Sequence, residues 1–322
     1  MDNPSEFIRR IPYSGSLDTF VAHVVKALQL GEFIQYSIIT VGYEDLNIRL
    51  ETKSSVYLVK CFGSFRDYAN CKRYVDILTQ VVDRGIRHPK LYENAGSFLH
   101  NYKNGQETVW YCVMDFIDGK SFYDLGVRPT KEEAIVLIQE AAKINSLDIT
   151  PDDYYDEWSP VNFVNEYSLK RQYLSHEAQS YLDTFVKPFS LINLSALTQA
   201  LVHGDIIRAN VIKDSHANLY IVDYSMAARK PRLQELSVLL CGMFFNENDP
   251  SHFTQYLDLV KKVYTPVLPK IEYEALPLFI TAVFAMYAMQ GEYSRAVKDM
   301  HTKENDYWVT VGNIGLQYCQ SK

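Results

Sequence analysis

Hydrophobic positions near the N-terminus follow first a helical period and then a strand period. From Leu17 to Leu28, apolar residues recur at the spacing of one helical face, with Ser16 as a candidate cap and Gly31 as a stop. Between residues 33 and 62, three strand-like runs follow, FIQYSIIT, LNIRLE and VYLVKCF, separated by polar turns. The pattern predicts an amphipathic helix packed on a small antiparallel sheet.

A second helix and a hairpin complete this region. Residues 66–84 regain a helical pattern that Gly85 ends. Two apolar runs, SFLHNYK and QETVWYCVMDF, then flank Asn104 and Gly105, a pair that tolerates the positive φ angles of a type I′ turn. Residues 1–115 are therefore predicted to form a lobe with two helices and a five-stranded antiparallel sheet.

The pattern beyond this lobe is mainly helical. Thr130 and Glu133 form a capping-box pair ahead of the run EAIVLIQEAAKI. The change predicts an α+β chain of two lobes, residues 1–115 and residues 116–322, joined by a hinge at MDFIDGK. Ligand sites commonly lie in clefts between such lobes.

Composition narrows the classes of partner. The 322 residues carry 39 acidic and 32 basic side chains, a net charge of −7, which argues against nucleic acid as a partner. Five scattered cysteines without a CxxC pair indicate neither a disulfide framework nor a zinc site and favour the cytoplasm. The most apolar stretch, residues 275–289, is too short to span a bilayer, so no membrane is expected. Monomer and homodimer both stay open.

The segment that carries chemistry is LVHGDIIRANVIKDSHANLYIVDY, residues 201–224. Asp205 and Asp223 stand at or near the ends of two apolar, strand-like runs, and Asn210 follows Asp205 by five positions. A hairpin between the runs would bring the three side chains into one cleft. Phosphoryl transfer needs a carboxylate that deprotonates the attacking hydroxyl and oxygen ligands for magnesium, and these residues supply both.

HGDIIRAN followed by IVDY resembles the aminoglycoside phosphotransferase and choline kinase branch of the kinase-like superfamily, whose signature is HGDxxxxN and a later strand ending in aspartate. The resemblance implies a bilobal protein-kinase-like fold and transfer of the ATP γ-phosphoryl group to a small-molecule hydroxyl. It implies Asp205 as catalytic base, Asn210 and Asp223 as Mg²⁺ ligands, and His203 as a brace of the loop. Taken singly, these residues would also suit a turn cap, a surface turn and a strand end.

The resemblance also implies a nucleotide site in the first lobe. Lys60, within VYLVKCF, corresponds to the third-strand lysine that contacts the ATP phosphates. Asp76 is the first candidate for its acidic partner and Asp67 the second, although the family uses glutamate there. Gly42, in VGYEDLN, is the single glycine of the predicted phosphate loop, with Asn47 nearby.

Main-chain groups of the hinge would bind adenine. By position, Met114 resembles the gatekeeper, the Asp115 carbonyl would accept from the adenine amino group, and the Ile117 amide would donate to the ring. In the helical lobe, Glu235 would replace the family's aspartate beneath the catalytic loop, as a structural anchor. Arg208, inside that loop, is expected to face the surface, and contact with phosphate or with an acidic group of the substrate is the alternative.

The acceptor is expected to bind to the helical lobe. PDDYYDEW (151–158) and FFNENDP (244–250) combine acidic and aromatic residues, which suit a cationic amine. Amino alcohols, hydroxy-amino acids such as homoserine, aminoglycosides and sugars all stay open. A nucleotide-binding pseudokinase acting as an interaction module is one alternative, suggested by the single-glycine loop. A protein kinase is the other, disfavoured by HGD in place of HRD and by the lack of DFG and APE segments.

Overall fold

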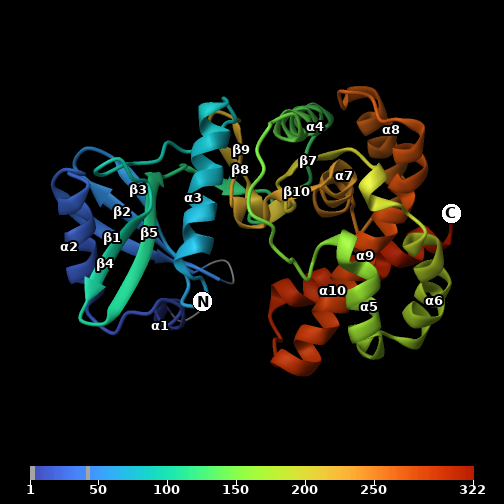
Figure 1. The fold of residues 1–322 in the computed structure, drawn as a ribbon, viewed down its shortest axis with the longest axis horizontal. Coiled ribbons are helices and arrows are strands. Elements are labelled where there is room, and N and C mark those ends of the chain that lie inside the picture. The colour runs from blue at the N-terminus through green and yellow to red at the C-terminus, as the bar shows by residue number, and fades with distance from the viewer. Residues whose placement is uncertain (1–3, 41–43) are drawn as a thin grey trace. The chain divides into compact units, whose positions relative to one another are not determined.

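The computed structural model describes residues 4–40 and 44–322 (Figure 1). Gly42, the predicted phosphate-loop glycine, lies outside the described residues. The chain divides into an N-terminal unit, Met1–Gly119, and a C-terminal unit, Lys120–Lys322. The division falls a few residues beyond the predicted boundary, inside the segment expected to act as a hinge.

The N-terminal unit contains the predicted five-stranded antiparallel sheet, with strand order β1-β2-β3-β5-β4. Its strands are β1 (Phe33–Ile39), β2 (Leu46–Thr52), β3 (Val56–Cys61), β4 (His100–Asn104) and β5 (Glu107–Asp115). A short helix that the sequence pattern did not predict, α1 (Pro4–Ile8), precedes the rest. The α+β class of the prediction is confirmed.

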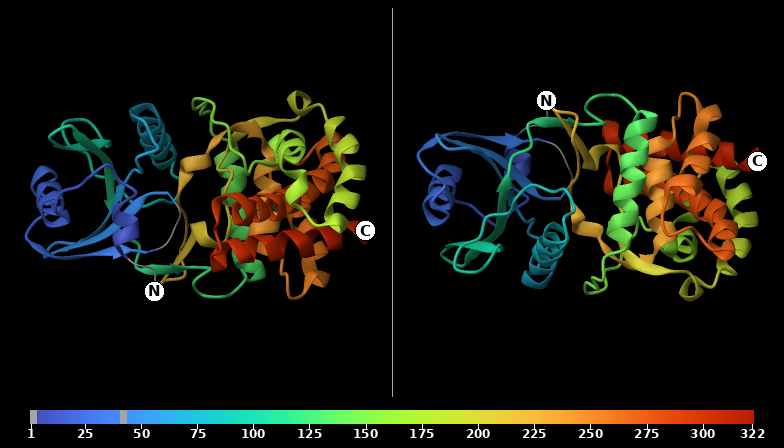
Figure 2. Two further views of the ribbon diagram at one scale, coloured as in Figure 1. Left: turned by 90° about the horizontal axis from the view of Figure 1, so that it is seen from below. Right: turned by 90° about the horizontal axis from the view of Figure 1, so that it is seen from above.

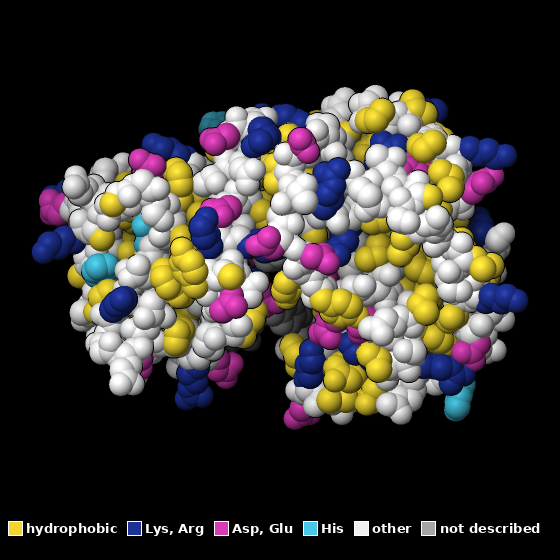
Figure 3. Space-filling view, viewed as in Figure 1, with side chains coloured by type: hydrophobic (Ala, Val, Ile, Leu, Met, Phe, Trp, Pro, Cys, Tyr) yellow, Lys and Arg dark blue, Asp and Glu magenta, His cyan; other side chains and the backbone are white. Residues whose placement is uncertain are grey.

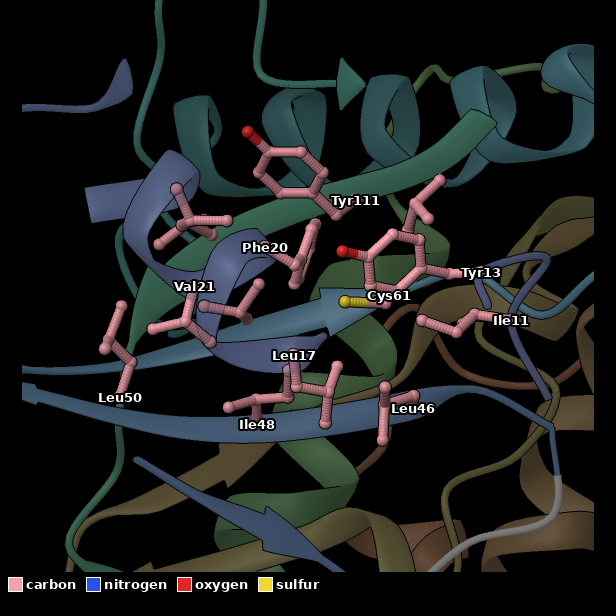
Figure 4. Close-up of a cluster of buried hydrophobic side chains, with 14 of the residues drawn as sticks. Ile11, Tyr13, Leu17, Phe20, Val21, Leu46, Ile48, Leu50, Cys61 and Tyr111 are labelled. Atoms are coloured by element: carbon pink, nitrogen blue, oxygen red, sulfur yellow. The ribbon is translucent and has the colours of Figure 1, made fainter. Parts of the chain in front are cut away.

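A helix covers each face of this sheet (Figures 1 and 2). On one face, α2 (Leu17–Ala27), capped by Ser16, packs its apolar stripe onto the inward side chains of β2, β3 and β5. Figure 4 shows Phe20 and Leu17 of α2 among these strand residues. On the other face, Tyr74 of α3 (Tyr68–Asp83) packs its ring 5.4 Å from the ring of Phe62. The strand period therefore decides which helix each side chain meets.

The β4–β5 hairpin differs from the prediction in its turn. Asn104 pairs with Glu107, so the central turn residues are Gly105 and Gln106 rather than Asn104 and Gly105. Gly105 has a φ of +60°, and among the described residues Gln106 does not have a positive φ. A positive φ at the first central position alone is the pattern of a type II′ turn, so the predicted type I′ turn is wrong.

The C-terminal unit is mainly helical. Its longer helices are α4 (Lys131–Asn145), α5 (Phe163–Lys170), α6 (His176–Ser190), α7 (Arg232–Leu239), α8 (Phe253–Val263), α9 (Lys270–Lys298) and α10 (Lys303–Gln320). Two small sheets accompany them: β7 (Gln199–Val202) with β10 (Ala228–Pro231), and β6 (Gly119–Ser121) with β8 (Val211–Asp214) and β9 (Leu219–Ile221). The predicted capping box is confirmed at α4, where Thr130 and Glu133 exchange both hydrogen bonds.

The helix α9 is long and apolar enough, by length and composition, to cross a membrane, and it extends well beyond the predicted apolar stretch of residues 275–289. Its most apolar window is 72% buried inside the unit, as in the core helix of a globular protein. The helix α10 approaches it closely, because a Cβ atom at Gly312 would lie 2.3 Å from the main-chain nitrogen of Ala288. The close approach of α10 therefore accounts for part of this burial.

Surface charge and thiols complete the description. On the face shown in Figure 3, acidic and basic side chains are interspersed rather than gathered into one basic patch. All five cysteines are free thiols, and Cys319 alone among them is not buried.

Candidate active site

Glu235 of α7 holds the loop that follows β7. This side chain is fully buried, and its two carboxylate oxygens accept the main-chain N–H groups of His203 and Gly204 at 3.0 and 2.9 Å. Gly204 has a φ of +82°, a left-handed conformation that favours glycine. These contacts are the ones that the predicted anchor role of Glu235 requires, although the role itself stays a prediction.

His203 links the loop to the end of β9. Its Nδ1 atom accepts the main-chain N–H of Asp205 at 3.2 Å, so the ring proton lies on Nε2. Nε2 then donates to the Val222 carbonyl at 3.1 Å. The imidazole thus connects the residue before Asp223 to the backbone of Asp205. Its role as a brace of the loop stays a prediction.

Asp205 and Asn210 are in direct contact. The amide nitrogen of Asn210 donates to a carboxylate oxygen of Asp205 at 2.6 Å and to its main-chain oxygen at 3.1 Å. Asn210 directly precedes β8, and its carbonyl accepts the N–H of Val222 at 2.9 Å. Since β8 and β9 pair as an antiparallel hairpin, Asn210 and Asp223 lie at the same end of it. The structure therefore brings together the three residues predicted to carry the chemistry.

Asp223 has an unusual backbone. Its φ and ψ are 67° and 73°, in the left-handed region, and its side chain accepts the N–H of Ser225 at 3.4 Å. A residue other than glycine costs about 1–2 kcal/mol in this conformation, although aspartate and asparagine tolerate it best. Such strain clusters at functional sites, where the surrounding structure holds it in place.

The site carries an excess of negative charge. Burial raises the pKa of Asp205 well above its usual range, and the negative charges of Asp223, Asp156 and Glu304 raise it further. The hydrogen bond from Asn210 acts in the opposite direction but does not offset them. Several carboxylates thus gather where a cation would relieve their repulsion.

The two predicted acceptor segments differ in how their acids are used. In the segment 151–158, the negative charge of Asp156 raises the pKa of Asp205. Glu157 of the same segment forms a 2.8 Å ion pair with the buried Lys170 of α5. In the segment 244–250, Glu247 pairs with Arg128. The first segment therefore contributes negative charge near Asp205.

Arg208 does not face the surface as expected. It is 7% exposed, donates to the Phe122 carbonyl at 3.2 Å and lies 5.8 Å from the ring centres of Tyr123 and Tyr307. Two aromatic faces and a carbonyl suit a guanidinium that is largely withdrawn from water. The expectation was wrong because these partners lie far from Arg208 in the sequence, and the two isoleucines before it did not indicate them.

In the N-terminal unit, Lys60 pairs with an acid that the sequence analysis missed. Its Nζ atom lies 2.9 Å from a carboxylate oxygen of Asp45, the residue just before β2. Asp76, the predicted partner, instead pairs with Lys72, and its side chain is 47% exposed. Asp67, the second candidate, caps α3 by accepting the N–H of Asn70.

The physical reason for this correction is the helical period. Tyr74 of α3 faces Lys60, whose Nζ lies 5.1 Å from the centre of its ring. Asp76 follows two positions later, about 200° around the helix axis, and so points away. Alternation along the chain could have revealed Asp45. Asn47 of β2 is directly opposite Lys60, and Asp45, two positions earlier and just before β2, is placed diagonally to Lys60 on the same face when the register is continued.

The residues predicted to bind adenine lie at the end of β5 and just after it. Met114 is buried, and the carboxylate of Asp115 accepts the hydroxyl of Tyr92 at 2.7 Å. The carbonyl of Ile117 accepts the N–H of Gly119 at 3.0 Å. Their role in binding adenine stays a prediction.

A pH-dependent stability difference should reveal the buried carboxylate of Glu235. Burial raises its pKa from the ordinary 4.5 to about 7, against the two backbone hydrogen bonds that lower it. The folded protein then binds more protons than the unfolded chain between those values, so this group's contribution to stability falls as pH rises from about 4.5 to about 7. Glu235→Gln removes this titration.

We therefore expect the free energy of unfolding of the wild-type protein, relative to Glu235→Gln, to decrease by a few kcal/mol across that window. Urea unfolding of both proteins at several pH values measures it, and titrating groups common to both cancel. At low pH the variant should be less stable by about 1–3 kcal/mol, because one loop N–H loses its acceptor. A difference that does not vary with pH would contradict the buried titration.

Comparison with known proteins supports the predicted resemblance. The family model described as the phosphotransferase enzyme family matches residues 35–267. The fold is similar to that of a spectinomycin phosphotransferase solved with ADP and spectinomycin, at 14% identity, with 94% of this chain and 98% of that chain covered and a TM-score of 0.63. No curated protein matches the sequence significantly.

Two further solved structures share this fold. The choline kinase of Streptococcus pneumoniae is 13% identical, with coverage of 94% of this chain and 100% of that chain and a TM-score of 0.60. A microcompartment-associated aminopropanol kinase is 12% identical, with coverage of 93% and 96% and a TM-score of 0.62. Because the family match spans most of the chain and includes Lys60, Asp205 and Asp223, the chain belongs to the phosphotransferase enzyme family and is a small-molecule kinase.

Proposed function

We propose that this kinase transfers the γ-phosphoryl group of ATP, with Mg²⁺, to the hydroxyl of a small molecule that also carries a cationic amine. The observation that supports the proposal most is the contact of Asp205 with Asn210 at the end of the hairpin that leads to Asp223. The negative charges of the acidic side chains that raise the pKa of Asp205 would attract a cationic group, which supports an acceptor with an amine.

Asp205 is the proposed catalytic base. It orients the acceptor hydroxyl and takes its proton as the acceptor oxygen bonds to the γ-phosphorus. The bond from that phosphorus to the bridging oxygen breaks, and ADP leaves with the electron pair. The hydrogen bond from Asn210 fixes the carboxylate of Asp205, so that one oxygen is already oriented before the acceptor binds.

The residues present fit a divalent cation. The amide nitrogen of Asn210 is committed to Asp205, which leaves its carbonyl oxygen as the donor atom, and Asp223 adds a carboxylate. Among the described residues there is no group of three or more His, Cys, Asp or Glu side chains suited to a metal ion, in keeping with a site that phosphate oxygens complete. A bound Mg²⁺ would neutralise charge on the phosphates.

Nucleotide binding is assigned to the N-terminal unit and its last strand. We infer that Lys60 contacts the α- and β-phosphates as a point charge. The main chain of Asp115 and Ile117, beside Met114, would bind the adenine ring. We place the enzyme in the cytoplasm, where ATP is available and its free thiols stay reduced.

The acceptor would meet a negative and aromatic environment. The negative charges of Asp156 and Glu304 raise the pKa of Asp205. Asp205 in turn raises the pKa of Tyr287, whose ring lies 4.6 Å from that of Trp308. Carboxylates and aromatic faces both attract an ammonium group. Amino alcohols, hydroxy-amino acids and aminoglycosides carry such a group, whereas neutral sugars do not.

A panel of matched acceptors tests this assignment. We expect ATP consumption with amino alcohols to exceed that with diols of the same length by about 10-fold or more in kcat/KM, because one ammonium–carboxylate contact contributes about 1.5–3 kcal/mol. Asp156→Asn should reduce this preference, because it removes a negative charge that the ammonium group would meet. Coupled measurement of ADP release reports both rates.

Asp183→Asn, at an exposed acid of α6 that pairs with Arg171, provides the control and should keep the preference. Equal turnover of diols and amino alcohols would contradict the cationic acceptor without contradicting the kinase. No turnover with any hydroxyl compound of the panel would contradict both.

A further inference from the structure

We propose that Asp45 is the residue that positions Lys60 for the nucleotide, in place of an acid on the helix α3. The inference rests on the proposed function, because it assumes that Lys60 contacts the phosphates. It concerns a residue of the loop before β2 that the sequence pattern did not single out.

The ion pair between the two residues is buried. The Nζ atom of Lys60 lies 2.9 Å from one oxygen of Asp45, and the two side chains are 7% and 3% exposed. Charges withdrawn from water in this way interact far more strongly than charges on a surface. The pair therefore fixes the ammonium group, whereas an exposed pair would leave it mobile.

Asp45 is itself held in place by other groups. Its second carboxylate oxygen accepts the N–H of Gly63 at 2.9 Å and the Nε–H of Arg66 at 3.2 Å. Its main-chain oxygen accepts a hydrogen bond from Arg10 at 3.2 Å. An acid with this many fixed partners is pre-organised, so its position does not depend on Lys60.

Gly63 provides independent support for this arrangement. A Cβ atom at position 63 would lie 2.6 Å from the main-chain oxygen of Glu44, the neighbour of Asp45. Glycine therefore allows the chain after β3 to approach the chain before β2 closely enough for the hydrogen bond to Asp45. The backbone at Gly63 thus lies close enough to donate its N–H to the carboxylate of Asp45.

The helix α3 offers Lys60 no acid on the side that faces it. At that place Tyr74, which is buried, presents its ring at 5.1 Å from the Nζ atom. A ring face attracts the ammonium group but gives it no hydrogen-bond acceptor comparable to a carboxylate. Asp45 thus performs the task of fixing the lysine, and Tyr74 adds to it.

Nucleotide titrations of Asp45→Asn test the inference. The substitution keeps an oxygen for Gly63 but removes the charge, so we expect the Kd for Mg·ATP to rise by about 10- to 100-fold, the effect of one charge-assisted contact. Asp76→Asn is the matched control on α3 and should leave the Kd within about 2-fold. Calorimetry gives the Kd, and urea unfolding gives the stability of each variant.

A double-mutant cycle separates positioning from a purely structural role. If Asp45 acts through Lys60, Asp45→Asn should raise the Kd much less in a Lys60→Met background than in the wild-type protein. Gly63→Ala displaces Asp45 but keeps its charge, so it should also raise the Kd for Mg·ATP. This variant replaces Asp45→Asn in the test if Asp45→Asn does not fold.

The outcomes distinguish the inference from the function on which it rests. Wild-type binding of Mg·ATP combined with an unchanged Kd in both Asp45→Asn and Gly63→Ala would overturn the role of Asp45 alone. A lower stability of Asp45→Asn with an unchanged Kd would make Asp45 a structural residue and would overturn it as well. A wild-type protein that does not bind Mg·ATP would overturn the proposed function together with the inference.

Discussion

Asp205→Asn should lower kcat for phosphoryl transfer by about 10³-fold, within the range that general-base catalysis contributes. The asparagine cannot take the proton of the acceptor hydroxyl, but it keeps an oxygen that accepts the hydrogen bond from Asn210. Affinity for Mg·ATP should change little, since Asn210 and Asp223 are the proposed metal ligands. Single-turnover kinetics with a radiolabelled γ-phosphate and nucleotide calorimetry measure the two effects separately.

The same variant should be at least as stable as the wild-type protein. Burial and the neighbouring carboxylates disfavour the charged form of Asp205, as its raised pKa shows, and the amide removes that repulsion. A thermal unfolding temperature at or above that of the wild-type protein would therefore show that the activity of Asp205→Asn is lost through the missing base and not through a misfolded loop. An Asp205→Asn enzyme with wild-type turnover would exclude Asp205 as the base.

Removing the carboxylate of Asp223 should abolish the magnesium dependence of nucleotide binding. We expect Asp223→Asn to lower kcat/KM for ATP by about 10²- to 10³-fold, because phosphoryl transfer depends on charge neutralisation at the phosphates. Asparagine is the appropriate replacement, since it tolerates the left-handed backbone at this position. Titration of ADP with and without Mg²⁺ measures the effect directly.

Two other variants serve as controls for this experiment. Asp223→Ala removes the carboxylate and also adds backbone strain, so it should lose about 1 kcal/mol of stability that the asparagine variant keeps. Asp258→Asn makes the same chemical change at an exposed position of α8 and should leave magnesium dependence intact. Unaltered magnesium dependence in Asp223→Asn would remove Asp223 from the metal site.

The sequence predicted the features that depend on local pattern. Alternation along three short runs indicated the strands, and the spacing from Asp205 to Asn210 and on to Asp223 indicated a hairpin. The capping pair of α4 was readable for the same reason, because it lies within one helical turn. Membership in the phosphotransferase family disfavours the pseudokinase alternative that the glycine-poor loop had suggested.

Features that depend on packing were not readable in the same way. Asp76 is an acid on the helix that packs against the strand of Lys60. The direction of its side chain depends on which face of α3 meets the sheet, and the sequence did not show which face that is. Arg208 looked like a surface residue because its aromatic partners lie far from it in the sequence. The β4–β5 turn shifted by one residue because strand register, rather than the Asn-Gly pair, set its centre.

The positions of Asp45, just before β2, and of Lys60, in the paired strand β3, bear on how such an enzyme can be controlled. In protein kinases the lysine pairs with a glutamate on a movable helix, and shifting that helix turns catalysis off. Here Lys60 belongs to β3, and Asp45 directly precedes β2, the strand that pairs with β3, so folding of the sheet brings the two charges together. Movement of the helix α3 alone would therefore not separate this ion pair.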